Sequence, residues 1–268
     1  MRIGKRDFQT SGHTYVMGIL NVTPDSFSDG NKWTRLDMAR RHVEGMITEG
    51  ADLIDIGGES TRPGYTLLPD DVEMERVLPA IEMVKREFDI PISVDTYKSK
   101  VARAAIAAGA DLVNDIWGLK YDAAMADLIA GSGAACCLMH NREQADYTDF
   151  LSDLLSDLGE TITIAGNAGI SSDRIILDPG VGFGKTHAQN LIIINHLETL
   201  HTLGYPILLG ASRKSVIGQV LNLPSSQRLE GTLATTVFAV QKGAMFVRVH
   251  DVRSNVRIIK MTEALLNG

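Results

Sequence analysis

Short apolar segments alternate with longer segments of helical periodicity along most of the chain. The apolar segments are continuous rather than alternating, which is typical of strands covered by helices on both faces. The predicted strands span residues 16–20, 53–56, 92–94, 112–113, 135–139, 175–177, 207–209 and 246–249. The helical periodicity covers residues 36–49, 72–88, 99–108, 123–130, 149–168, 189–203, 228–242 and 254–266.

The order of these segments predicts eight successive strand–helix units. Gly50, Gly109 and Gly243 each follow a predicted helix and precede a strand, as a glycine just past a helix end commonly does. We therefore expect an α/β fold, a (β/α)8 TIM barrel, as a single domain over residues 1–268. A doubly wound open sheet is the alternative. Residues 1–14 precede the first strand and are expected to form a small hairpin at the bottom of the barrel.

Composition narrows the classes of protein that remain. The chain has 268 residues, close to the roughly 250 of a typical barrel of this kind. Hydrophobic residues make up 44%, which excludes a disordered chain. The formal net charge is −7, so we expect no general binding to nucleic acid or to an anionic membrane surface.

The chain also lacks the signals of export. No apolar run approaches the roughly 18 residues of a membrane span, and no apolar segment of a secretory signal follows Met1. Cys136 and Cys137 are adjacent in a predicted strand, where neighbours point to opposite faces, so a disulfide between them is not expected. Two buried thiols suit a reducing compartment, and we predict a cytoplasmic protein.

Polar residues follow nearly every predicted strand. In a (β/α)8 barrel the carboxyl ends of all strands meet at one face, where active sites form. Any one of these residues could be a helix cap or part of a structural ion pair, but together they predict a polar pocket with acidic and basic sides. They are Asn21, Glu59, Asp95, Asn114, Asp115, His140, Asp178, Arg213, Lys214, Arg248 and His250.

The same strand ends resemble, in order, the motifs of the dihydropteroate synthase family. The longest are MGILNVTPDSFSDG at residues 17–30 and DIGGESTRPG at 55–64. SVDT at 93–96, NDI at 114–116, LDPG at 177–180, GFGK at 182–185, SRKS at 212–215 and RVHD at 248–251 follow. Eight motifs in one order are far more specific than any one of them.

The resemblance implies a transferase of folate synthesis. Its reaction would join 6-hydroxymethyl-7,8-dihydropterin diphosphate to p-aminobenzoate, giving 7,8-dihydropteroate and pyrophosphate. It further implies Mg²⁺ as cofactor, a homodimer formed through outer helices, and inhibition by sulfonamides, which mimic aminobenzoate.

The resemblance assigns the two edges of the pterin ring. A carboxylate can satisfy a row of N–H donors along one edge, and this role would belong to Asp178. Asp95 and Asn114 would hold the opposite edge. The alternatives are a turn role for Asp178 before Pro179 and a purely structural pair of Asp95 and Asn114.

Three further residues would complete the pterin pocket. Lys214 would donate to the ring acceptors, Arg248 would lay its guanidinium on the ring face, and Met139 would touch the ring. Their ordinary alternatives are a solvated lysine, an arginine in an exposed ion pair and a core methionine. The catalytic residues that the resemblance implies are Lys214, Asp95, Arg62 and Asp29.

The aminobenzoate pocket would be built from loops. Ser215 begins a predicted helix, whose free N–H groups and dipole suit a carboxylate. Phe183 and Pro63 would sandwich the aromatic ring, although packing within the loops is the alternative for both. The full set is Phe27, Thr61, Arg62, Pro63, Phe183 and Ser215.

The diphosphate needs donors and cations. The candidates are Asn21, Arg62, Arg248 and His250, helped by the start of the last helix. Mg²⁺ prefers oxygen ligands and keeps several waters, so Asn21 together with diphosphate oxygens would suffice to bind it. Solvated ion pairs and a helix-start role for His250 are the alternatives. We expect the loops at 21–30 and 59–64 to close over the diphosphate.

The reaction would be an SN1-like displacement. The sequence offers many candidate donors to a diphosphate but no nucleophile motif. This favours a mechanism in which the enzyme stabilises the leaving group and positions the amine, without a covalent enzyme intermediate. Residues 180–186 also resemble a nucleotide-binding P-loop, but Pro179 stands where that motif needs its first glycine.

Two other functions remain as alternatives. A pterin-binding methyltransferase module, which passes a methyl group from methyl-tetrahydrofolate to a corrinoid, could share Asp95, Asn114 and Asp178. It has no need of Arg62 or Lys214, which suit a diphosphate and an arylamine acid. A catalytically silent homologue is the second alternative, and its candidate residues should have been lost.

Overall fold

The computed structural model describes residues 1–23, 32–59 and 67–268, and in this part of the chain eight parallel strands form one sheet. They are β3 (Tyr15–Asn21), β4 (Leu53–Gly57), β5 (Ile92–Asp95), β6 (Leu112–Asp115), β7 (Ala135–Met139), β8 (Ile175–Asp178), β9 (Leu208–Leu209) and β10 (Phe246–Val249). Their order in the sheet is β8-β7-β6-β5-β4-β3-β10-β9. A parallel bridge between Leu177 and Ile207 joins β8 to the start of β9, so the sheet closes into a barrel.

The predicted (β/α)8 barrel is confirmed, and the open sheet is excluded because the two outer strands meet. Four strands, β3, β5, β6 and β8, extend one or two residues beyond their apolar run and take in the polar residue that follows it. Asn21, Asp95 and Asp178 are each the last residue of a strand. The polar side chains are therefore held by the rigid sheet rather than by flexible loops.

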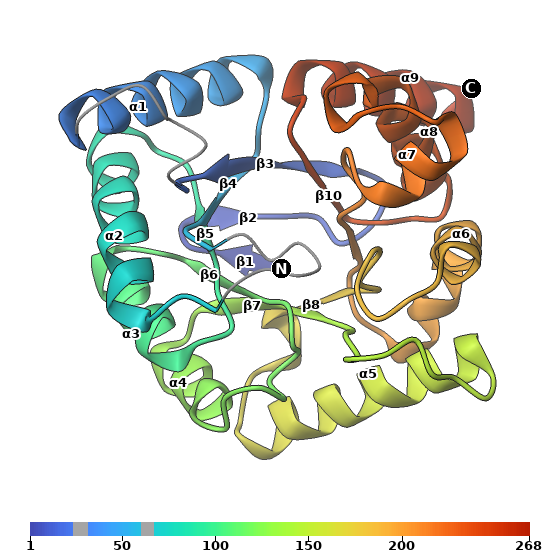
Figure 1. The fold of residues 1–268 in the computed structure, drawn as a ribbon, viewed down its shortest axis with the longest axis horizontal. Helices are drawn as coiled ribbons and strands as arrows, with labels where there is room; N and C mark the ends of the chain where they lie inside the picture. Colours follow the sequence, from blue (N-terminus) through green and yellow to red (C-terminus); the bar gives the residue numbers. More distant parts are fainter. Residues whose placement is uncertain (24–31, 60–66) are drawn as a thin grey trace.

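Helices surround the strands (Figure 1). They are α1 (Lys32–Glu49), α2 (Asp70–Glu87), α3 (Ser99–Ala108), α4 (Ala124–Ser132), α5 (Phe150–Asn167), α6 (His187–Asn195), α7 (Ser215–Leu221), α8 (Leu229–Gln241) and α9 (Val252–Asn267). Their buried apolar side chains pack against the outward-facing residues of the strands as one large core. Short 3-10 helices cover Ser172–Arg174, Leu197–Leu203 and Ser225–Gln227.

One predicted helix is in fact two elements. The periodicity over residues 189–203 predicted a single helix, but α6 ends at Asn195 and a 3-10 helix follows from Leu197. The backbone leaves the helical region at His196, where φ is −110° and ψ is 30°. Leu197 and Leu200 are both buried, and their spacing of three residues places them on one face of a 3-10 helix.

The predicted N-terminal hairpin is also confirmed. Strands β1 (Arg2–Ile3) and β2 (Arg6–Asp7) pair antiparallel. Ile3 and Phe8 are buried against Phe246 and other residues at the start of the barrel strands. Figure 1 places the N-terminus inside the ring of strands. These apolar side chains fill the interior at this end of the barrel, and in folds of this kind the active site forms at the opposite end, where the strands finish.

The two cysteines lie side by side in β7. Cys136 and Cys137 are free and buried, as predicted. Burial raises the pKa of both thiols, so they are unreactive packing residues. No helix in the described ranges combines the length and the apolar character that a membrane crossing requires.

Candidate active site

Arg248 on β10 crosses the mouth of the barrel and joins three strands. Its Nε donates to Oδ2 of Asp55 on β4, and an NH2 group donates to Oδ2 of Asp95 on β5, both at 2.6 Å. Asp55 also accepts from Ser93 Oγ at 2.5 Å and from Asn114 Nδ2 at 3.4 Å. The guanidinium is thus held between two carboxylates in a fixed plane.

The second oxygen of Asp95 has no such partner. Oδ1 is buried and accepts no hydrogen bond from any described residue. Burial raises the pKa of Asp95 to about 7, the nearby Arg248 guanidinium opposes that rise, and Asp55 adds to it. Buried polar atoms are nearly always hydrogen-bonded, so a lone acceptor at the mouth of a barrel is ready for a donor on a ligand.

Asp178 and Lys214 form the opposite wall. Asp178 ends β8, and its Oδ1 accepts from the backbone N–H of Gly180 at 2.7 Å. Burial raises its pKa, and the Lys214 ammonium opposes this. Burial likewise lowers the pKa of Lys214 to about 8, opposed by Asp178. Each charge therefore keeps the other ionised within a buried pocket.

The two walls lie close together. A Cβ added to Gly210 would lie 3.4 Å from Oδ2 of Asp178 and 4.0 Å from the Cβ of Arg248. Asp178 and Arg248 therefore flank the same glycine. The glycine thus brings the wall formed by Asp178 close to the wall formed by Arg248.

An apolar patch lies beside these charges. Met139, at the end of β7, packs with Ile116, Trp117 and Phe183. The Nζ of Lys214 lies 4.5 Å from the centroid of the Phe183 ring and donates to the carbonyl of Val181 at 2.6 Å. The patch offers flat and polarizable surface to an aromatic ligand.

The residues around Asn21 suit a hard cation that shares its ligands with a substrate. A Cβ added to Gly57 would lie 3.6 Å from Oδ2 of Asp95 and 3.8 Å from Oδ1 of Asn21, so both side chains lie beside Gly57, although Oδ2 of Asp95 is bound by Arg248. Across the described ranges, no cluster of three or more His, Cys, Asp or Glu side chains is arranged to hold a metal alone. Asn21 Oδ1 is an oxygen of the kind that Mg²⁺ binds, and Mg²⁺ usually completes its shell with water and phosphate.

His250 and Ser215 lie at the edge of the site. The Nδ1 of His250 lies 3.0 Å from Ser212 Oγ, which also accepts from the His250 backbone N–H at 3.2 Å. Ser215 is exposed and is the first residue of α7, as predicted. Arg213 is turned away into an ion pair with Asp251 at 2.5 Å, so it is unavailable to an anionic ligand.

Several predicted residues thus come together, and others do not. The structure gathers Asp95, Asn114, Met139, Asp178, Phe183, Lys214 and Arg248 around one mouth, with Asn21 and His250 at its border. Phe27, Asp29, Thr61, Arg62 and Pro63 lie outside the described residues, and so do most of the two loops expected to close.

Three of the strand-end residues have structural roles instead. The carboxylate of Asp115 accepts from the backbone N–H groups of Trp117 and Leu119, both at 2.8 Å. His140 turns toward α5 and binds Asp157. Glu59 accepts from Lys98 Nζ at 3.0 Å. Strand-end position alone does not decide whether a side chain faces the mouth or an outer helix.

Asp55 is the residue that the analysis of the sequence missed. It is fully buried and fixes Arg248, yet it received no role because it lies inside an apolar strand rather than after one. A buried acid in an apolar strand needs a partner cation, and this requirement could have indicated from the sequence that Asp55 pairs with a basic residue of the site.

The comparisons with known proteins agree with this geometry. Residues 17–250 match the family described as pterin binding enzyme. The chain therefore belongs to the pterin binding enzymes. A dihydropteroate synthase of Clostridium beijerinckii is 56% identical over 267 residues, which is 99% of either chain. Within the pterin binding enzymes, the chain thus belongs with the dihydropteroate synthases, as the sequence motifs predicted.

Solved structures support the same grouping. A dihydropteroate synthase from Clostridium difficile, crystallised in the presence of pteroic acid, has a TM-score of 0.94 and 48% identity, with 100% of both chains covered. A dihydropteroate synthase from Xanthomonas albilineans with 4-aminobenzoic acid has a TM-score of 0.91 and 43% identity, covering 96% of this chain and 94% of its own.

Proposed function

We propose that this chain condenses 6-hydroxymethyl-7,8-dihydropterin diphosphate with p-aminobenzoate to give 7,8-dihydropteroate and pyrophosphate. The observation that carries the proposal is the buried and unpartnered Oδ1 of Asp95, which lies in a mouth that also holds Asp178 and Lys214. A pterin supplies the missing N–H donors along one edge and acceptors for the lysine along another.

Within this site, the pterin ring would lie between the two walls. Asp178 would accept from the amino-pyrimidine edge, while Asp95 and Asn114 would hold the other edge. Lys214 would donate to the ring acceptors. Met139 and the plane of Arg248 would cover the ring faces, and the two carboxylates bound to Arg248 keep that plane fixed.

The arylamine and the diphosphate would occupy the rim. Phe183 and Ser215 would contact p-aminobenzoate, together with Phe27, Thr61, Arg62 and Pro63. Asn21, Arg62, Arg248 and His250 would bind the diphosphate. Mg²⁺ held by Asn21 would neutralise negative charge on the leaving diphosphate.

The chemistry follows from these positions. The bond from the pterin methylene carbon to the diphosphate oxygen breaks, and its electron pair leaves with the diphosphate. The ring spreads the positive charge that remains, and the arylamine nitrogen then bonds to the methylene carbon and releases a proton to water. The protein orients the two reactants and stabilises the separating charges, so the displacement would be SN1-like.

A direct assay tests the proposal. Purified protein is mixed with the dihydropterin diphosphate, p-aminobenzoate and Mg²⁺, and dihydropteroate and pyrophosphate are measured. We expect both products in equal amounts, and omission of p-aminobenzoate should prevent formation of dihydropteroate. Methyl transfer from methyl-tetrahydrofolate to a corrinoid without any condensation would contradict the proposal.

The pH dependence should report on Asp95. When ionised, both of its oxygens accept hydrogen bonds, whereas protonation turns one of them into a donor. Its pKa of about 7 therefore predicts that kcat/KM for the pterin substrate rises with pH and levels off above that value. Asp95→Asn should lower the plateau and remove this acid limb. Initial rates at saturating p-aminobenzoate, from about pH 5.5 to about pH 8, check it. An unchanged acid limb in the variant would show that another group titrates.

A homodimer is the second part of the proposal. Exposed apolar side chains on α6, α7 and α8 form a continuous face around a hollow lined by Ile194, Val216 and Ile217. The exposed members are Leu191, Ile192, Val220, Leu221 and Phe238. A large apolar patch of this kind is typical of an interface, and a second copy could cover it symmetrically.

Sedimentation can test this assembly. We expect the wild type to sediment as a dimer, and Val220→Glu to sediment near the monomer mass of 29.1 kDa, because a charge in a dry interface is costly. Leu265→Glu on α9 is the matched control, since Leu265 is 71% exposed and does not line the hollow. A monomeric wild type at micromolar concentration would refute the dimer.

We also propose the cytoplasm as the location. The support is indirect and consists of the two free thiols of β7 and the folate chemistry of the site.

A further inference from the structure

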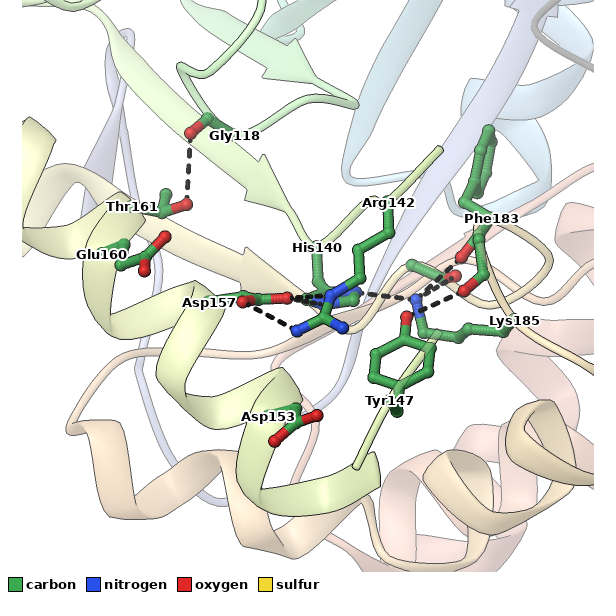
Figure 2. Close-up of polar contacts among 12 residues, drawn as sticks. Gly118, His140, Arg142, Tyr147, Asp153, Asp157, Glu160, Thr161, Phe183 and Lys185 are labelled. Carbon is green, nitrogen blue, oxygen red and sulfur yellow. Dashed lines mark hydrogen bonds and ion pairs between the residues drawn. The ribbon is translucent and has the colours of Figure 1, made fainter. Parts of the chain in front are cut away.

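The loop that follows β8 is tied to itself by one lysine. The Nζ of Lys185 donates to the carbonyl oxygens of Gly180 and Phe183, both at 3.0 Å, and lies 2.8 Å from Nδ1 of His140 (Figure 2). These three acceptors match the three N–H bonds of an ammonium group. Residues 180–185, here called the β8 loop, are thus held together by the side chain of Lys185, which bonds two backbone carbonyls of the same loop.

His140 anchors this lysine to an outer helix. Its Nε2 lies 2.9 Å from Oδ2 of Asp157 on α5. A carboxylate only accepts hydrogen bonds, so Nε2 carries the hydrogen and Nδ1 presents its lone pair to Lys185. Burial and the neighbouring Lys185 lower the pKa of His140 to about 3, which keeps the ring neutral. Histidine is therefore a fixed link and not a titrating group.

Asp157 is itself held in place. The guanidinium of Arg142 binds it with two bonds, from Nε at 2.6 Å and from NH2 at 3.1 Å. Tyr147 stacks on Arg142 and donates its hydroxyl to the carbonyl of Gly184 at 2.8 Å. Figure 2 shows these side chains converging between α5 and the β8 loop.

The β8 loop packs tightly against the backbone of residues 140–142. A Cβ on Gly180 would collide with the carbonyl of His140, and one on Gly184 would collide with the backbone of Arg142. Both glycines have positive φ values, 71° and 52°. Only glycine therefore allows the backbone to lie this close to residues 140–142, and Lys185 adds a side-chain contact to His140.

This loop reaches directly into the proposed site. The N–H of Gly180 fixes Asp178, the carbonyl of Val181 accepts from Lys214, and the ring of Phe183 lies beneath the Lys214 ammonium. A shift of the loop would therefore move Asp178, which would accept from the pterin, together with Phe183, which would line the aminobenzoate pocket.

We propose that Lys185 is a positioning residue of the transfer reaction: held by His140 and Asp157, it fixes the β8 loop so that Phe183 and Lys214 face the two substrates. The inference rests on the proposed function, but the anchoring of the loop can be measured without turnover. Burial lowers the pKa of Lys185 to about 7. The carboxylates of Asp178 and Asp157 oppose this fall, and the cations Lys214 and Arg142 add to it.

Lys185→Met is the central test, because it keeps the length of the side chain and removes the three N–H bonds. We expect KM for p-aminobenzoate to rise about tenfold or more and kcat to fall about tenfold, since Phe183 and Lys214 lose their placement. KM for the pterin diphosphate should rise less than KM for p-aminobenzoate, because Asp95, Asn114 and Arg248 still hold the ring although Asp178 and Lys214 shift with the loop.

Lys120→Met is the matched control. Lys120 also binds α5, through the carbonyl of Asp157 at 2.9 Å and the carboxylate of Glu160 at 3.0 Å, but it makes no bond to the β8 loop. All kinetic constants of this variant should stay within about twofold of the wild type. An equal loss in both variants would point to α5 and not to the loop.

Two further measurements separate positioning from mere stability. In a Phe183→Leu background, Lys185→Met should raise KM for p-aminobenzoate much less, because the group through which it acts is gone. Aminoethylation of Lys185→Cys, which creates a sulfur analogue of lysine, should restore most of the lost activity. Cys136 and Cys137 are fully buried and position 185 is half-buried, so the new thiol is more accessible than either of them.

Hydrogen exchange reads the loop itself. Backbone amides of residues 180–185 should exchange faster in Lys185→Met than in the wild type or in Lys120→Met. If the wild type shows no condensation activity but Lys185→Met still exchanges faster than the wild type, the proposed function is refuted and the anchor stands. Unchanged exchange and unchanged KM for p-aminobenzoate would overturn the anchor. If Lys185→Met does not fold, Lys185→Gln, which keeps two N–H bonds, carries the same tests.

Discussion

Lys214→Ala should lower kcat/KM for the condensation by about a thousandfold or more. Removing one electrostatic group that acts on a reacting centre costs roughly 10² to 10³ in rate. Here the loss extends to a second residue, because the Lys214 ammonium opposes the rise that burial imposes on the pKa of Asp178. Without it, Asp178 takes up a proton more readily, and a protonated carboxyl cannot accept two N–H bonds from the pterin edge.

The effect should therefore depend on pH in a defined direction. At higher pH Asp178 ionises again, so part of the lost pterin binding in Lys214→Ala should return as the pH rises. Titration calorimetry with the pterin diphosphate at two pH values measures this, and steady-state assays measure the rate. Lys260→Ala is the control, since Lys260 is exposed on α9. A variant that retains more than about a tenth of the wild-type kcat/KM would remove Lys214 from the site.

The fold was predictable because each strand and helix carries its own local signal. The eight apolar runs place every barrel strand to within a few residues, and glycines end three of the helices as expected. The break at His196 was missed because Leu197 and Leu200 fit an α-helical and a 3-10 pattern equally well over so few residues. The N-terminal hairpin was predicted from position alone, and Ile3 and Phe8 give the physical reason for it.

The site was predictable only as far as a barrel brings strand ends together. Residue type and position indicated Asp95, Asp178, Lys214 and Arg248, but not which partner each would take. The bond from Arg248 to Asp55 joins residues 193 positions apart, and no local pattern encodes such a pairing. His140 shows the same limit, because the direction of a strand-end side chain depends on the helix that packs beside it.

Arg248→Met should lower the free energy of unfolding by about 3–5 kcal/mol, because it leaves two carboxylates buried without their cation. The side chain of Asp55 is 0% exposed and that of Asp95 is 11% exposed, so both carboxylates depend chiefly on the guanidinium to balance their charge. Asp95 already has a raised pKa, and the loss of Arg248 raises it further. The folded variant thus binds more protons than its unfolded chain.

The sign of the pH dependence follows from this proton uptake. A group that binds more protons in the folded state loses stability as the pH rises, so Arg248→Met should be more unstable at about pH 8 than at about pH 6. Urea unfolding at both values measures the difference. Adding Asp55→Asn should recover roughly 1–3 kcal/mol, because it removes one of the two stranded charges and retains a hydrogen-bonding oxygen. A loss below about 1 kcal/mol in Arg248→Met, or strict additivity in the double variant, would mean that the bridge across the barrel mouth contributes to ligand binding alone.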